Sequence, residues 1–227
     1  MAILLTLLLS LQDDAAAQAE AAVAQFRTAF KKPDVNARVA AVGELGKVQH
    51  AKTGTVLAGL LTADVPPVRR RAAEMLGQWQ TRQAPISAIL QAAVKPNQKE
   101  PGVLSALYDA MGTLRDKSAV DDVTNALSHD NDDVVLAAVR AAGKLGSGKA
   151  IDRLLGLWQS VIDYHEGHIS TDGKRTFIPH TPELDRKYGM RDAEVRPAVA
   201  AITKKSFGDL NSARTWWNAN RQTFKEQ

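Results

Sequence analysis

The sequence predicts an all-α fold, a right-handed α-solenoid of about four to five helical-hairpin repeats with a helical cap at each end. The main observation is a set of four glycines spaced 31, 35 and 31 residues apart: Gly46, Gly77, Gly112 and Gly143. Each has a small or apolar residue nine, five and one positions before it, and an apolar residue two positions after it. A register kept over four units is typical of stacked helical repeats.

The composition agrees with an array of this kind. Only 5% of the 227 residues are aromatic, while alanine is abundant, which suits close packing of helix on helix. The net charge of +4 is lower than is usual for a dedicated nucleic-acid binder. The absence of cysteine excludes disulfides, thiolate zinc sites and cysteine nucleophiles.

The first segment predicts export. Residues 2–11 (AILLTLLLSL) are too short an apolar run to span a bilayer, but they have the length of a signal-peptide core. Small residues follow at 15–17, so we expect residues 1–17 to be a signal peptide and the protein to be periplasmic or secreted. The alternative is that this run belongs to an N-terminal helix of a cytoplasmic protein. Residues 18–32 predict an N-terminal capping helix.

Residues 33–163 predict the repeats, each consisting of two helices. The first helix begins at a turn with aspartate or proline and ends near its glycine, where we expect the left-handed backbone of a helix stop. A valine at Gly77 should therefore destabilise the array by about 1 kcal/mol or more, and a valine at Gly102, in a predicted loop, by less. The second helices carry apolar stripes: Leu57, Leu60, Leu61; Ile86, Ile89, Leu90; Val123, Ala126, Leu127; Leu154, Leu157, Trp158.

The repeat rhythm fails after Trp158. Residues 164–191 hold two prolines, three glycines and three histidines without a helical stripe, so they predict an irregular loop insertion. This loop is the best candidate for a function-specific element, with a disordered spacer as the alternative. Residues 192–227 predict a degenerate repeat followed by a C-terminal capping helix.

One segment carries a family signature. The pattern Asp-x-x-x-Val-Arg-x-x-Ala-Ala-x-x-Leu-Gly occupies residues 64–77 and is partly kept in the fourth repeat. It resembles the short HEAT-like repeats, of the type also found in phycobilisome lyases. The tail, with Trp216 and Trp217, resembles the ending of exported bacterial HEAT-repeat proteins. This resemblance implies a scaffold that binds proteins, with a lyase-type or chromophore-handling enzyme component as the alternative.

The histidines of the loop are candidate metal ligands. His165 and His168 lie three residues apart, and His180 would return from the far end of the loop. The simpler interpretation is a solvated loop in which the histidines are incidental, so we expect no metal and no cofactor. The same three histidines are candidates for partner contact. HEAT-repeat hydroxylases with two irons place His-Glu pairs on successive repeats, whereas only His165-Glu166 occurs here.

Basic and aromatic residues give the other candidates. Arg69, Arg70 and Arg71, with Arg82 beyond, would suit phosphates, as in DNA glycosylases built on HEAT-like repeats. The simpler interpretation is that Arg69, like Arg38, ties neighbouring turns together and that Arg70 and Arg71 face solvent. Arg70 and Arg71 are then candidates for partner contact. The tryptophans are also candidates. We expect Trp79 and Trp158 to be buried in the core. Of the adjacent Trp216 and Trp217, one should seal the last repeat and the other be available as a binding anchor; we take Trp217 as a partner-binding candidate.

No glycine-rich phosphate loop, Ser-His-Asp set or paired-carboxylate motif stands out, so no catalytic residue is assigned. We therefore expect a non-catalytic scaffold with another protein as its partner. Nucleic-acid binding is the second alternative, and no transmembrane span or small-molecule substrate is expected.

Overall fold

The computed structural model describes residues 2–79 and 86–225, the side chains of residues 2–13 excepted. The fold is an all-α solenoid of helical hairpins, as predicted. The chain divides into two compact units, Met1–Ala110 and Met111–Gln227.

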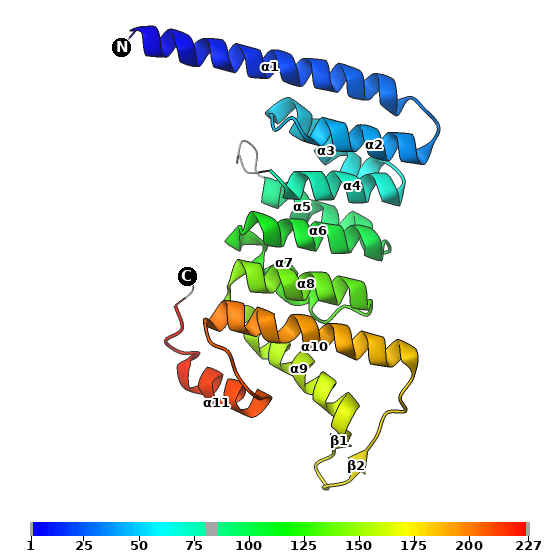
Figure 1. Cartoon of the computed structure of the whole chain (residues 1–227), viewed down its shortest axis with the longest axis vertical. Helices are drawn as coiled ribbons and strands as arrows, with labels where there is room; N and C mark the ends of the chain where they lie inside the picture. Colours follow the sequence, from blue (N-terminus) through cyan, green and yellow to red (C-terminus); the bar gives the residue numbers. More distant parts are fainter. Residues whose placement is uncertain (1, 80–85, 226–227) are drawn as a thin grey trace. The chain divides into compact units, whose positions relative to one another are not determined.

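In the first unit, α2 and α4 lie side by side, and α3 and α5 form a second layer behind them (Figure 1). Helix α1 packs on α2 and α3, and its residues Ala19 and Phe26 are buried there. The elements are α1 (Ala2–Phe30), α2 (Val35–Gly46), α3 (Ala51–Ala63), α4 (Pro66–Gly77), α5 (Ile86–Val94), the 3-10 helix η1 (Lys95–Asn97) and the greater part of α6 (Pro101–Leu114).

In the second unit, α8 and α10 lie side by side, with α7 packed on α8 and α9 packed on α10. Two short antiparallel strands lie between α9 and α10. The elements are η2 (Lys117–Ala119), α7 (Val120–Ala126), α8 (Asp132–Leu145), η3 (Gly148–Ala150), α9 (Ile151–Glu166), β1 (His168–Ile169), β2 (Arg175–Thr176), α10 (Pro182–Thr203) and α11 (Leu210–Asn220).

The helices begin where the sequence places helix-starting residues. The Asp34 carboxylate accepts a hydrogen bond from the Ala37 amide at 2.7 Å and so caps α2. Asn131 is the cap of α8, and its side chain accepts from the amides of Asp133 and Val134. Proline at the first position starts both α4 and α6, where its missing N–H costs nothing.

The reason predicted for the repeat glycines is wrong. Gly46 and Gly77 are the last residues of their helices and Gly112 lies inside α6, and none of these three has the left-handed backbone. Their role is close approach: a Cβ atom added at Gly77 would lie 2.6 Å from Cβ of Ala110 on the next first helix. Helices that pack this closely leave no room for a methyl group.

Gly102 also differs from the prediction, since it lies in the first turn of α6 rather than in a loop, although a Cβ there would meet open space. The predicted loop 164–191 is shorter than expected. Its residues 164–166 end α9, and residues 182–191 are the first ten residues of α10, which continues to Thr203. These ten residues lack an apolar stripe because they extend beyond the core, and ion pairs together with the ring of Tyr188 hold them instead.

The cores are formed by the stripes that the sequence indicates. Trp79 and Trp158 are buried as predicted, and the Trp79 ring N–H donates to the Gly46 carbonyl at 3.2 Å. Leu57, Leu90 and Leu154 are completely buried on the second helices. None of the helices in the part of the chain that the structure describes is both long and apolar enough to cross a lipid bilayer.

Candidate partner-binding site

The connection between α9 and α10 is the most irregular part of the second unit. Gly167 ends α9 with a φ of 84°, and Gly173, with a φ of 78°, makes the turn between β1 and β2. Only glycine adopts such angles without strain. In the strands, His168 pairs with Thr176 and Ile169 pairs with Arg175. We call residues 167–181 the α9–α10 hairpin.

Polar contacts fix the hairpin at its root. On one side, His168 Nδ1 lies 3.2 Å from an oxygen of Asp163 on α9, and the Arg175 guanidinium donates to the carbonyl of Glu166 at 2.9 Å. On the other side, His180 Nδ1 lies 2.8 Å from Asp185 in the first turn of α10. The hairpin is therefore an ordered projection tied to both helices.

A stack of rings lies beneath this root. The Tyr164 side chain is buried, stacks on Tyr188 with ring centroids 4.3 Å apart, and contacts His180 at 4.5 Å. Its hydroxyl donates to Asp185 at 2.6 Å. This hydrogen bond, followed by that from His180, lowers the pKa of Asp185, whereas burial and then the bond to Asp185 raise the pKa of Tyr164.

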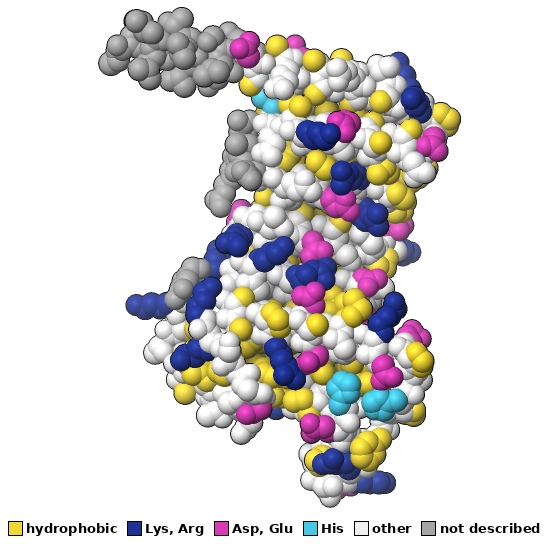
Figure 2. Space-filling view, viewed as in Figure 1, with side chains coloured by type: hydrophobic (Ala, Val, Ile, Leu, Met, Phe, Trp, Pro, Cys, Tyr) yellow, Lys and Arg dark blue, Asp and Glu magenta, His cyan; other side chains and the backbone are white. Residues whose placement is uncertain are grey.

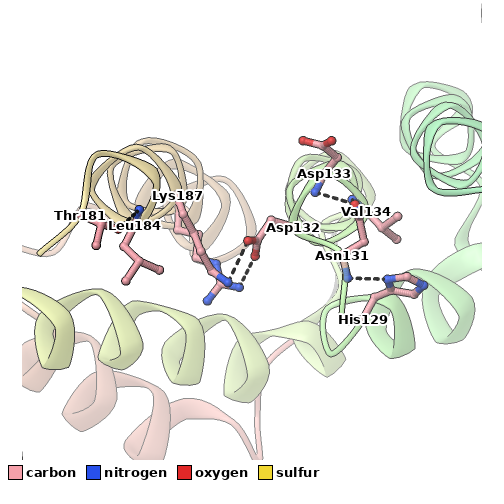
Figure 3. Close-up of polar contacts among 9 residues, drawn as sticks. His129, Asn131, Asp132, Asp133, Val134, Thr181, Leu184 and Lys187 are labelled. Carbon is pink, nitrogen blue, oxygen red and sulfur yellow. Dashed lines mark hydrogen bonds and ion pairs between the residues drawn. The ribbon is translucent and has the colours of Figure 1, made fainter. Parts of the chain in front are cut away.

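An ion-pair fork fixes the start of α10 on α8 (Figure 3). Asp132, in the first turn of α8, pairs with Lys187 at 2.8 Å through one oxygen and with Arg191 through the other. Burial alone would raise the pKa of Asp132, but the hydrogen bonds from Lys187 and Arg191 outweigh it and leave the pKa lowered. Thr181 caps α10 by accepting from the Leu184 amide at 3.2 Å. Both ends of the hairpin thus emerge from fixed helices.

The hairpin itself exposes apolar side chains. Phe177 is 69% exposed and Ile169 is 55% exposed, and Ile178 follows at 38%. Ile169 faces Arg175 across the strand pair, and Phe177 is two residues after Arg175, so Ile169 and Phe177 share one face. In Figure 2 hydrophobic side chains are visible on the hairpin, below the histidines at its root. Exposed apolar side chains on an ordered projection are typical of a contact surface.

The three predicted histidines are brought into this region, but not to one point. The rings of His165 and His180 are 6.2 Å apart, whereas His168 is turned to Asp163. Among the described residues, no group of three or more His, Cys, Asp or Glu side chains is placed to hold a metal ion. His168 and His180 instead contact carboxylates at the two ends of the hairpin, while the ring of His165 lies against that of Tyr164.

The arginine cluster lies in the first unit, away from the hairpin residues in the sequence. Arg69 donates to the Asp64 carbonyl and to the Asn97 side chain, and Arg38 binds both oxygens of Asp64 at 2.8 Å, which confirms the predicted tying of turns. Arg70 and Arg71 both pair with Glu74, at 3.4 and 3.0 Å. Arg82 lies outside the described residues. The cluster is thus partly neutralised.

The prediction for the paired tryptophans assigned the wrong ring to the surface. Trp217 is buried, and its ring N–H donates to Asp152 on α9 at 2.8 Å. It therefore seals the second unit and is not available to a partner. Trp216 is half-buried and contacts Phe207 and Phe224. Trp216, which we did not choose as a partner-binding candidate, is therefore the tryptophan of this pair with some exposed surface.

Sequence reasoning also missed the apolar residues of the hairpin. Ile169, Phe177 and Ile178 were hidden in a segment defined by its histidines and its lack of a helical stripe. The available signal was a polar turn, Ser170-Thr171-Asp172-Gly173, between two short apolar stretches, which is a hairpin pattern.

Comparison with known families agrees with the repeat fold. A family model described as HEAT repeats matches residues 53–133 and again residues 86–163. Together the two matches cover residues 53–163, and they support a HEAT-like repeat protein. The matched HEAT repeats extend from α3 to α9 and end just before the α9–α10 hairpin. No curated protein matches the chain. HEAT repeats are in general interaction scaffolds.

Proposed function

We propose that this protein is a non-catalytic scaffold that binds another protein through the apolar face of the α9–α10 hairpin. The observation that carries the proposal is the exposure of Phe177 beside Ile169 on a projection whose two ends are fixed. Large aromatic side chains of this kind anchor protein interfaces, because they bury much area and lose little conformational entropy. The regular helices beside it supply a rigid base.

The test compares proteins that copurify with three tagged versions of the full chain from the native host. These are the unmodified protein, Phe177→Ser, and Met190→Ser, which changes an exposed apolar residue of α10 outside the hairpin. We expect a stoichiometric partner that is lost with Phe177→Ser and retained with Met190→Ser. A partner retained by both variants would contradict docking on the hairpin. A copurifying pigment would favour the lyase-type alternative. A copurifying nucleic acid would favour the nucleic-acid-binding alternative.

We also propose that residues 1–17 are removed during export. Cleavage after Ala17 would leave residues 18–30 of α1, including the buried Ala19 and Phe26, to cover the first repeat. This proposal rests on the apolar run at residues 2–11, which is followed by small residues at 15–17. Intact-mass measurement on protein from the native host tests this, and recovery of the full-length chain from the cytosol would contradict it.

A further inference from the structure

A groove runs along the C-terminal ends of α8 and α10 in the second unit, on residues other than those of the hairpin. Its volume is about 440 Å³, and its floor consists of Gly143, Pro197, Ala198 and Ala201. The groove is hollowed because the side chains on its floor are small. Helices α8 and α10 also approach closely at Gly143. The shape suits an extended chain that lies across the two helices.

The walls of the groove are basic. Among the described residues, the lining side chains Arg115, Arg140, Lys144 and Lys204 are accompanied by a single carboxylate, Glu194, which lies 3.6 Å from Arg140. Figure 2 shows Lys and Arg side chains gathered over the left-hand ends of α8 and α10. Helix C-termini carry roughly half a negative charge each, so the ends of α6, α8 and α10 offset only part of this excess. The groove remains positive.

The backbone gives a second, independent observation. Among the described residues, Arg115 and Lys204 are the non-glycine residues with positive φ, at 54° and 57°. Both end a first helix and both line this groove. The corresponding stop of α8 is Gly146, with a φ of 68°. A left-handed residue other than glycine costs about 1 kcal/mol or more, so these two cations occupy positions that folding alone would give to glycine.

The helix dipole does not account for this choice. A cation near the end of a helix is favourable, but Lys144 provides one on α8 from a helical position, without a left-handed backbone. Arg115 and Lys204 both keep a strained backbone and both face the groove. This points to a role for their positive charge in the groove.

We infer that this groove binds an extended acidic segment of a protein partner. An acidic segment complements the excess charge of the walls, and a floor of small residues leaves room for a peptide backbone. A nucleic acid is less favoured, since none of the described residues that line the groove has an aromatic ring for base stacking and the chain's net charge is only +4. The inference extends the proposed scaffold to a second surface.

The experiment uses the full chain and a fluorescent oligoglutamate of about eight residues, roughly 27 Å when extended. Anisotropy is measured at low and at physiological ionic strength, with oligoglutamine and oligothymidylate of the same length as comparison probes. We expect oligoglutamate to bind, salt to weaken it, and oligoglutamine not to bind. Absence of oligoglutamate binding overturns the inference, as does tighter binding of oligothymidylate, which would identify a nucleic-acid site.

Charge reversal locates the site. Arg115→Glu with Lys144→Glu should weaken oligoglutamate binding at least tenfold. The control, Lys32→Glu with Lys99→Glu, makes the same change in net charge at two exposed positions of the first unit and should change affinity by no more than about threefold. If both double variants weaken binding equally, oligoglutamate responds to the overall charge of the protein. That result would overturn the assignment of the binding site to the groove.

Glycine substitution separates function from folding. Arg115→Gly with Lys204→Gly should keep or raise the thermal midpoint while weakening oligoglutamate binding. Unchanged binding would overturn the role assigned to these two residues. Phe177→Ser, which tests the hairpin, should leave oligoglutamate binding intact, so the failure of one proposal can be told from the failure of the other.

Discussion

The regular repeats and the joint between α8 and α10 solve the same packing problem by different means. In α6, a Cβ atom at Gly112 would lie 2.5 Å from Cα of Ala141 on α8, so the two backbones are nearly in contact. In α8, a Cβ atom at Gly143 would lie 3.1 Å from Cα of Ala198 on α10. The second joint is looser, and the Asp132 fork and the Arg140–Glu194 pair are added to it.

The difference shows how an insertion is accommodated in a repeat array. Helix α10 is longer than α8, and its first turns lie beyond the closely packed glycine register. Charged contacts orient those turns, and the stacking of Tyr188 on Tyr164 is added to them. The hairpin is consequently attached to a helix held by ion pairs, and its position should depend on pH and on Asp132 more than the regular repeats do.

The largest effect should come from filling a close glycine contact. Gly112→Val should lower the free energy of unfolding by about 3 kcal/mol, because its side chain would overlap the backbone of Ala141. Gly77→Val should behave alike, for the same reason of close approach. Urea denaturation measures both. Gly102→Val is the control, with a change within about 0.5 kcal/mol, and an equal loss there would contradict the packing explanation.

A smaller loss is expected at the fork. Asp132→Ala removes the partner of Lys187 and of Arg191, whose side chain is only 13% exposed, and should cost about 1–2 kcal/mol. Asp133→Ala changes the neighbouring exposed carboxylate and is the matched control. Hydrogen exchange should localise the Asp132→Ala effect to the start of α10. A loss spread evenly over both units would mean that the fork does not act locally.

The pH dependence tests the same joint. The folded pKa values of Asp132 and Asp185 are lowered below the unfolded value of about 3.9. Their contribution is therefore present above about pH 4 and is lost as pH falls through the folded values. Urea melts between neutral and acid pH should show a shallower decline for Asp132→Asn than for the unmodified protein. Parallel declines would contradict this assignment.

The smallest effect should be found at Gly143. The methyl group of Gly143→Ala would lie 3.1 Å or more from α10, so a shift of a few tenths of an ångström accommodates it, and we expect a loss of under about 1 kcal/mol. Gly112→Ala places its methyl at 2.5 Å and should cost clearly more. If the two alanine variants melt alike, the two joints do not differ as described.

The sequence predicted the repeats because glycine, aspartate and proline at fixed spacing are direct consequences of helix packing and helix starts. It could not distinguish a glycine needed for close approach from one needed for a left-handed stop, since both occur near helix ends. The start of α10 was missed because its first turns have no buried face; the Thr181-Pro182-Glu183 start was the remaining signal. The roles of His168 and His180 depend on partners that only the folded chain brings together.

The offset between joints has a consequence for assembly. Each repeat glycine faces a residue two positions before the next register site, as Gly77 faces Ala110 and Gly112 faces Ala141. Since Gly143 faces Ala198, the register site on α10 is Ala200. A further first helix stacked on α10 would meet a methyl group where every earlier joint offers bare backbone. One side chain thus makes α10 less suited than the earlier first helices to receive another repeat at the same close distance.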